Sequence, residues 1–183
     1  MGAKEGLSNA KVPVLGFVAP GGTGKTTLLR AVIALLEDRS LRIGVAKQAR
    51  DDFDFDQPGK DSYRLRKAGV ERLLFASSRK SALILEHPDG GGPELNELLP
   101  LFDQDELDII LVEGFSEQPF PKIELIRGNK GPRHYPNDAW VIALAMDRTE
   151  AGQASVPVLD INDPAAVAEF VLAWMGGSSR HSL

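Results

Sequence analysis

The chain has 183 residues, 43% of them hydrophobic and 26% charged, as in an ordinary globular protein. Its formal net charge of -5 argues against a nucleic-acid-binding protein, which usually carries a basic face. The sequence contains no cysteine, which excludes disulfides, thiolate metal ligands and cysteine nucleophiles.

The chain opens with a strand-loop-helix-strand pattern. Residues 1–11 lack the apolar core of a signal peptide and are expected to form a flexible lead. No apolar run approaches the ~20 residues of a membrane helix, so we expect a cytoplasmic protein. Residues 12–19 are rich in β-branched side chains, apolar positions from Thr26 to about Asp38 have helical spacing, and residues 41–47 form a second strand. This order is typical of a parallel sheet with crossover helices.

The remaining elements continue this architecture. A short helix over residues 60–69 precedes a predicted hairpin with strands over 71–76 and 81–86. A helix is expected over 94–102 and strands over 107–112, 123–127, 140–146 and 156–159, before a last helix from Pro164 through Met175. We predict one α/β domain over residues 12–175, with a mostly parallel sheet and an additional edge hairpin. Residues 176–183 are expected to be a flexible tail.

A glycine-rich loop joins the first strand to the first helix. Residues 19–26 have the pattern Ala/Gly-x4-Gly-Lys-Thr, in the strand-to-helix context that a phosphate loop requires. Backbone N–H groups and the helix N-terminus attract phosphate, Lys25 is placed for the β- and γ-phosphates, and the Thr26 hydroxyl for Mg²⁺. A chance glycine-rich turn is the alternative. The loop predicts a three-layer P-loop NTPase fold, with Gly21, Gly22, Thr23, Gly24, Lys25, Thr26 and Thr27 as nucleotide-binding residues.

Two carboxylates at strand ends are candidates for the same site. Glu113 ends an apolar strand, whereas Asp108 lies about 16 Å away at the other end of that strand. Ligands of open α/β sheets bind at the carboxyl ends of strands, so Glu113 is the predicted metal ligand beside Thr26. Asp147 follows a later strand, a place where many P-loop GTPases have an aspartate that recognises guanine, and it is therefore the candidate for base recognition. The alternative for Glu113 is a solvent-exposed acid at a strand end, and the alternative for Asp147 is an ordinary helix or turn cap.

Four stretches of the sequence resemble the molybdopterin-guanine dinucleotide biosynthesis protein B (MobB) family, a P-loop GTP-binding family. They are residues 19–27, residues 53–62 (Phe-Asp-Phe-Asp-Gln-Pro-Gly-Lys-Asp-Ser), residues 111–115 and residues 121–124. The chain departs from the family at residues 48–51, where Gln48, Ala49, Arg50 and Asp51 replace histidines that the family commonly has.

The resemblance implies a GTP-binding adaptor that takes part in molybdenum cofactor biosynthesis. Such a protein binds GTP with Mg²⁺, is a weak GTPase at most, forms a homodimer, and assists the molybdopterin guanylyltransferase (MobA-type) that joins GMP to molybdopterin. It implies catalytic roles for Lys25, Asp54 and Glu113, with Asp54 or Asp56 orienting water bound to the metal, and a contact of Lys60 with phosphate or an anionic pterin.

Two other functions are compatible with the residues. A P-loop small-molecule kinase uses the same loop and carboxylate, although residues 128–136 hold only one arginine, Arg133, for a phosphate-covering lid. A binding module without turnover is the third possibility.

Overall fold

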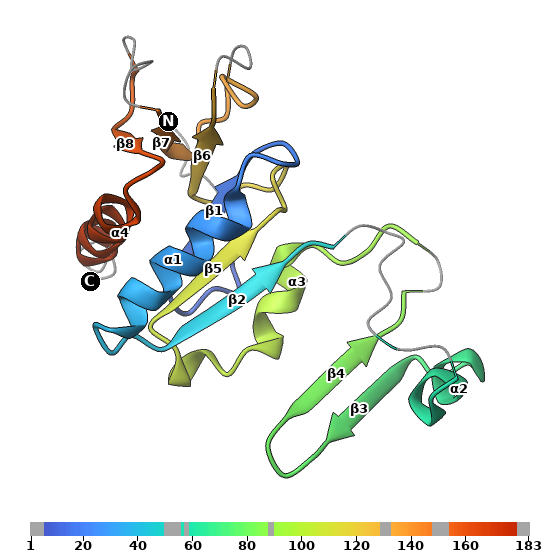
Figure 1. The fold of residues 1–183 in the computed structure, drawn as a ribbon. Helices are drawn as coiled ribbons and strands as arrows, with labels where there is room; N and C mark the ends of the chain where they lie inside the picture. The colour runs from blue at the N-terminus through green and yellow to red at the C-terminus, as the bar shows by residue number, and fades with distance from the viewer. Residues whose placement is uncertain are drawn as a thin grey trace. The chain divides into compact units, whose positions relative to one another are not determined.

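The computed structural model describes residues 6–49, 56, 59–87, 90–128, 133–147 and 154–178. Within the chain there are two compact units, Met1–Gln48 with Glu94–Leu183, and Ala49–Pro93 (Figure 1). The domain predicted over residues 12–175 therefore includes residues of both units.

The first unit contains a six-stranded sheet in the order β2-β5-β1-β6-β7-β8. Every neighbouring pair of these strands is parallel, which confirms the predicted α/β class. The strands are β1 (Val14–Val18), β2 (Ile43–Lys47), β5 (Ile109–Glu113), β6 (Lys122–Ile126), β7 (Val141–Met146) and β8 (Val158–Asp160).

Helices pack on both faces of this sheet and make three layers (Figure 1). Helices α1 (Lys25–Glu37) and α4 (Pro164–Ser178) bury their apolar side chains against Leu15, Leu111 and other residues of one face. Helix α3 (Leu95–Leu98) and the 3-10 turn η1 (Leu99–Leu101) pack against the other face. A second 3-10 turn, η2 (Gln104–Glu106), lies where the sequence predicted no element.

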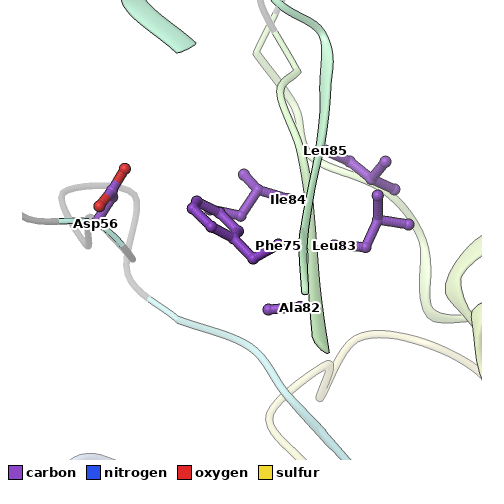
Figure 2. A pocket seen from close by; sticks show the side chains of 6 residues that line it. All are labelled: Asp56, Phe75, Ala82, Leu83, Ile84 and Leu85. Carbon is purple, nitrogen blue, oxygen red and sulfur yellow. The ribbon is translucent and has the colours of Figure 1, made fainter. Parts of the chain in front are cut away.

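The second unit contains α2 (Asp61–Lys67) and the predicted hairpin, whose strands are β3 (Arg72–Ala76) and β4 (Ser81–Leu85). The hairpin forms a two-stranded sheet of its own and is not an edge of the large sheet. Figure 2 shows Phe75 and Ile84 on the hairpin face that points toward Asp56, and Leu83 and Leu85 on the other face. A cavity of about 450 Å³ is lined by Asp56 and by hairpin residues.

Parts of both ends that were expected to be flexible make regular contacts in the first unit. Asn9 donates its N–H to Asn96 Oδ1 at 2.9 Å, and Lys11 donates its N–H to Gln104 Oε1 at 2.7 Å, within the segment expected to be a flexible lead. Helix α4 continues past Met175 to Ser178. Among the described residues, no helix is both long enough and apolar enough to cross a bilayer.

Candidate phosphate-binding site

The loop between β1 and α1 has the backbone of an anion-binding turn. Gly22 and Gly24 have φ values of 77° and 94°, which a side chain would strain. The Thr23 hydroxyl donates to the carbonyl of Pro20 at 2.8 Å and closes the turn. Helix α1 begins at Lys25 without a side-chain cap and without an acidic residue in its first turn. Its first N–H groups and its positive dipole end are therefore directed at a ligand of negative charge.

Two lysines and one carboxylate provide the charge at this edge of the sheet. The Lys25 ammonium lies 2.6 Å from the carbonyl of Ala19 and 3.1 Å from that of Pro20, across the phosphate loop. Lys47, at the end of β2, lies 3.3 Å from Glu113. Burial lowers the pKa of Lys25; Glu113 opposes this shift and Lys47 adds to it. The local charge is net positive and suits a polyphosphate.

Thr26 and Glu113, the two predicted metal ligands of the first unit, lie in contact with each other. The Thr26 hydroxyl lies 2.9 Å from one carboxylate oxygen of Glu113 and 3.1 Å from the other. No group of three or more histidines or acids among the described residues forms a protein-only metal cage. Mg²⁺ fits this arrangement because it usually takes one or two carboxylates and completes its shell with water and substrate phosphates.

Gln48 holds the turn that follows Glu113. Gly114 has φ 100° and Phe115 has φ 53°, two successive left-handed residues. Gln48 accepts the N–H of Phe115 on Oε1 at 2.8 Å and donates its own N–H to the carbonyl of Glu113 at 2.9 Å. A Cβ on Gly114 would lie 2.7 Å from Gln48 Cβ, so only glycine fits. Gln48 thus fixes the backbone of the turn that follows Glu113.

A cavity of about 190 Å³ lies where these groups meet. Its lining consists of Val18, Ala19, Lys25, Gln48, Glu113, Gly114, Ser116 and Tyr135. The cavity contains the lysine and the carboxylate that interact with the β- and γ-phosphates and their Mg²⁺ in P-loop proteins. Its lining therefore suits the terminal phosphates of a nucleotide.

Asp147 lies just beyond β7, at the same carboxyl edge of the sheet. Its Oδ1 accepts the side-chain amide of Asn162 at 2.8 Å and its Oδ2 accepts the N–H of Gly128 at 3.1 Å. The Asn162 hydrogen bond, then that of Gly128, and finally the charge of Arg127 lower the pKa of Asp147. The carboxylate is thus ionised at neutral pH and can accept N–H donors.

The other acidic and basic candidates belong to the second unit, to the opposite end of β5, or to the part of the chain that the structure does not describe. Asp54 lies outside the described residues. Lys60 belongs to the second unit, where it precedes α2 as its N-cap. Asp56, also in the second unit, accepts the Ser62 hydroxyl at 3.0 Å and lies 3.7 Å from Arg66. Asp108 lies at the start of β5, where it accepts the N–H of Arg42 at 2.7 Å.

Several residues of this edge were not among the sequence candidates. Gln48, Ser116 and Tyr135 line the cavity, and Asn162 holds Asp147. Arg127 follows β6, and its guanidinium lies 3.9 Å from the position that a Cβ on Gly24 would take. Arg127 and Asn162 each follow a strand of the parallel sheet, and that position is the signal that could have identified them.

Comparisons with known proteins agree with this geometry. The model of the family "Molybdopterin guanine dinucleotide synthesis protein B" matches residues 14–147. A molybdopterin-guanine dinucleotide biosynthesis adapter protein of Escherichia coli (strain K12) is 44% identical over 166 residues, covering 90% of this chain and 94% of that protein. The protein of the same description from Haemophilus influenzae (strain ATCC 51907 / DSM 11121 / KW20 / Rd) is 34% identical and covers 91% of this chain and 92% of its own length.

Solved structures show the same fold. A crystal structure of Bacillus subtilis MobB superposes with a TM-score of 0.70 at 22% identity, and covers 88% of this chain and 96% of that chain. A MobB homologue from Bacillus stearothermophilus superposes with a TM-score of 0.69 at 21% identity; the match covers 90% of this chain and 98% of that chain.

Proposed function

Because the chain belongs to the molybdopterin guanine dinucleotide synthesis protein B (MobB) family, we propose that it is a GTP-binding adaptor that assists the attachment of GMP to molybdopterin. The observation that carries the nucleotide part of this proposal is the contact of Thr26 with Glu113 beside the loop that Lys25 spans. The description of the relatives as biosynthesis adapters supports the pathway.

The triphosphate lies on the phosphate loop. The N–H groups of residues 21–27 surround the phosphates, Lys25 neutralises the β- and γ-phosphates, and Thr26 and Glu113 hold Mg²⁺ directly or through water. The site is close to what Mg²⁺ requires because the Thr26 hydroxyl already contacts both carboxylate oxygens of Glu113. When bound there, Mg²⁺ would neutralise part of the charge of the phosphates.

Asp147 recognises the guanine base. An ionised carboxylate accepts the ring N1–H and the exocyclic amine of guanine, whereas adenine has no proton on that ring nitrogen. The hydrogen bonds from Asn162 and Gly128 fix the position of Asp147 at the carboxyl edge. Arg127 is a further cation beside this carboxylate.

Turnover is weak, and the protein is a Mg²⁺-dependent GTPase at most. Glu113 is the one carboxylate among the described residues that line the cavity, and it contacts Thr26 and Lys47. Because these contacts engage its carboxylate, we assign Glu113 to binding and not to the activation of water. Of the predicted catalytic residues, Lys25 and Glu113 thus act through binding, and Asp54 is proposed to orient water at the metal. We also propose a cytoplasmic location, because GTP, which this function requires, is abundant there.

The partners are a molybdopterin guanylyltransferase (MobA-type) and a second copy of this chain. The hairpin exposes Leu74 and Leu83, which pair directly across the two strands and are 66% and 48% exposed. In the first unit, Val45 on the edge strand β2 and Leu101 are 43% and 54% exposed. An isolated two-stranded hairpin is marginally stable in water, and exposed apolar faces of this kind mark interfaces. These features favour a homodimer. Lys60 is a candidate contact for phosphate or for molybdopterin.

A nucleotide titration tests the base specificity. We expect Mg²⁺-GTP to bind at least tenfold more tightly than Mg²⁺-ATP, because the hydrogen bonds of a charged acceptor are worth about 1.5–3 kcal/mol. Asp147→Asn should lower GTP affinity by about tenfold and leave ATP affinity unchanged. Isothermal titration calorimetry measures both constants. The control, Asp108→Asn, changes the acid at the opposite end of the sheet and should bind as the wild type does. Equal affinity of the wild type for GTP and ATP would contradict the guanine assignment.

A further inference from the structure

The strand β6 buries two charged side chains on the sheet face that α1 does not cover. Lys122 is 1% exposed and Glu124 is 0% exposed, although charged residues are almost never fully buried unless they are paired. Both side chains lie on the same face of β6 because they are two residues apart in a strand. Their partners come from one segment of the chain, residues 133–138.

Glu124 binds the start of this segment at three points. It accepts the N–H of His134 at 2.7 Å, the N–H of Tyr135 at 3.2 Å and Nε of Arg133 at 3.0 Å. Arg133 in turn donates to the carbonyl of Tyr135 at 3.2 Å. A buried carboxylate that accepts this many hydrogen bonds fixes the position of the backbone and the guanidinium that supply them.

Lys122 binds the end of the same segment. Its ammonium lies 2.7 Å from Asp138 Oδ2, and Asp138 Oδ1 accepts the N–H of Trp140 at 2.8 Å. A buried ion pair is weak evidence for stability, since apolar residues of similar volume often stabilise as well or better. Two such pairs of opposite polarity under one short segment are better explained by the position that they impose on it.

The residue that these pairs position is Tyr135. Its ring packs against the apolar cluster of Val141, Leu144 and Met146, and its side chain is half-buried. Tyr135 also lines the cavity that contains Lys25 and Glu113. Of the described residues that line this cavity, Tyr135 alone comes from the connection between β6 and β7. The phenol hydroxyl is the one polar group of this side chain, and it can donate a hydrogen bond.

We propose that Tyr135 donates a hydrogen bond to the terminal phosphate of the bound triphosphate, and that Glu124 is the positioning residue that holds Tyr135 there. The inference rests on the proposed function, since it assigns a further contact in the same nucleotide site. It extends the recognition of the γ-phosphate beyond the phosphate loop and Mg²⁺, to a segment on the opposite face of the sheet from α1. The site therefore distinguishes GTP from GDP by a side chain that the loop motif does not include.

The test compares a non-hydrolysable GTP analogue with GDP, each titrated calorimetrically with Mg²⁺ into the full chain. Tyr135→Phe should weaken binding of the analogue by about tenfold, the loss expected for one hydrogen bond to a charged group, and leave GDP binding unchanged. Tyr63→Phe is the matched control, because Tyr63 is the other tyrosine of the chain and does not line this cavity, and it should bind both nucleotides as the wild type does.

Glu124→Gln tests the positioning role. It should reproduce the selective loss for the analogue, whereas a residue with only a stabilising role would alter the melting temperature and leave the ratio of the two affinities at the wild-type value. Glu37→Gln, at the exposed end of α1, is its control. A Tyr135→Phe protein with the wild-type ratio would overturn the contact, and a Glu124→Gln protein with that ratio would overturn the positioning role. A wild type that binds neither nucleotide would instead refute the proposed function, and this inference with it.

Discussion

Replacing Lys25 with alanine is expected to weaken GTP binding by about 2 kcal/mol, which is roughly thirtyfold in the dissociation constant. Lys25 spans the phosphate loop, with its ammonium 2.6 Å from the carbonyl of Ala19. It is also partly withdrawn from water, which lowers its pKa and strengthens its interaction with a bound anion. Calorimetric titration with Mg²⁺-GTP measures the change.

The control is Lys11→Ala. Lys11 pairs with Asp105 at 3.3 Å on the exposed surface, so its loss should leave both affinity and stability close to the wild-type values. If Lys25→Ala bound GTP as tightly as the wild type does, the phosphates would lie somewhere other than on residues 19–27.

Replacing Leu74 with glutamate is expected to convert a dimer into a monomer. In a two-fold symmetric interface each residue occurs twice, so a single substitution removes two buried leucines. Full burial of one leucine contributes about 1.5–3 kcal/mol, and two carboxylates would add the cost of losing water. Light scattering after size-exclusion chromatography should therefore give a mass near 19.8 kDa for the variant and twice that mass for the wild type.

Arg79→Glu provides the comparison for this experiment. Arg79 lies in the exposed turn between β3 and β4, so the substitution introduces the same carboxylate outside the apolar face and also removes a positive charge, which makes it the more severe change in charge. This variant should stay dimeric. A Leu74→Glu protein with the mass of the wild type, or a wild type that is itself monomeric, would show that the hairpin face does not mediate dimerisation.

The features that could be predicted from the sequence are those encoded by neighbouring residues. The phosphate loop is a contiguous motif, and its strand and helix follow from local periodicity. The first four residues of β5 are apolar because helices cover both faces of the sheet, and a run such as Ile-Ile-Leu-Val is readily recognised. The choice of Glu113 over Asp108 as the acid at the carboxyl edge needed only the direction of a parallel strand, and the structure brings Glu113 to Thr26.

Other features depend on contacts between distant residues. The pairing of Glu124 with residues 133–135 cannot be deduced from a strand followed by a polar connection, because local pattern does not indicate which strand charges are buried. The local sequence around Tyr135 therefore did not indicate a binding role, although this residue lines the cavity. The same holds for Gln48, since a side chain that bonds the Phe115 backbone looks in the sequence like a solvent-exposed residue after a strand.

The hairpin illustrates a different difficulty. Both of its strands were predicted, with their turn, because β3 and β4 carry β-forming residues on either side of a polar tetrapeptide. Whether a strand pair extends a larger sheet depends on the path of the flanking segments, which propensity does not determine. The hairpin forms a separate two-stranded sheet, and its exposed Leu74 and Leu83 are intelligible once that is known.

The most direct test of the adaptor function is a pull-down with a purified molybdopterin guanylyltransferase. The chain, immobilised in the presence of Mg²⁺-GTP, is expected to retain that enzyme, and Lys25→Ala should retain it less well if the nucleotide-bound form is the one recognised. Failure of the wild type to retain the enzyme, both with and without Mg²⁺-GTP, would contradict the account.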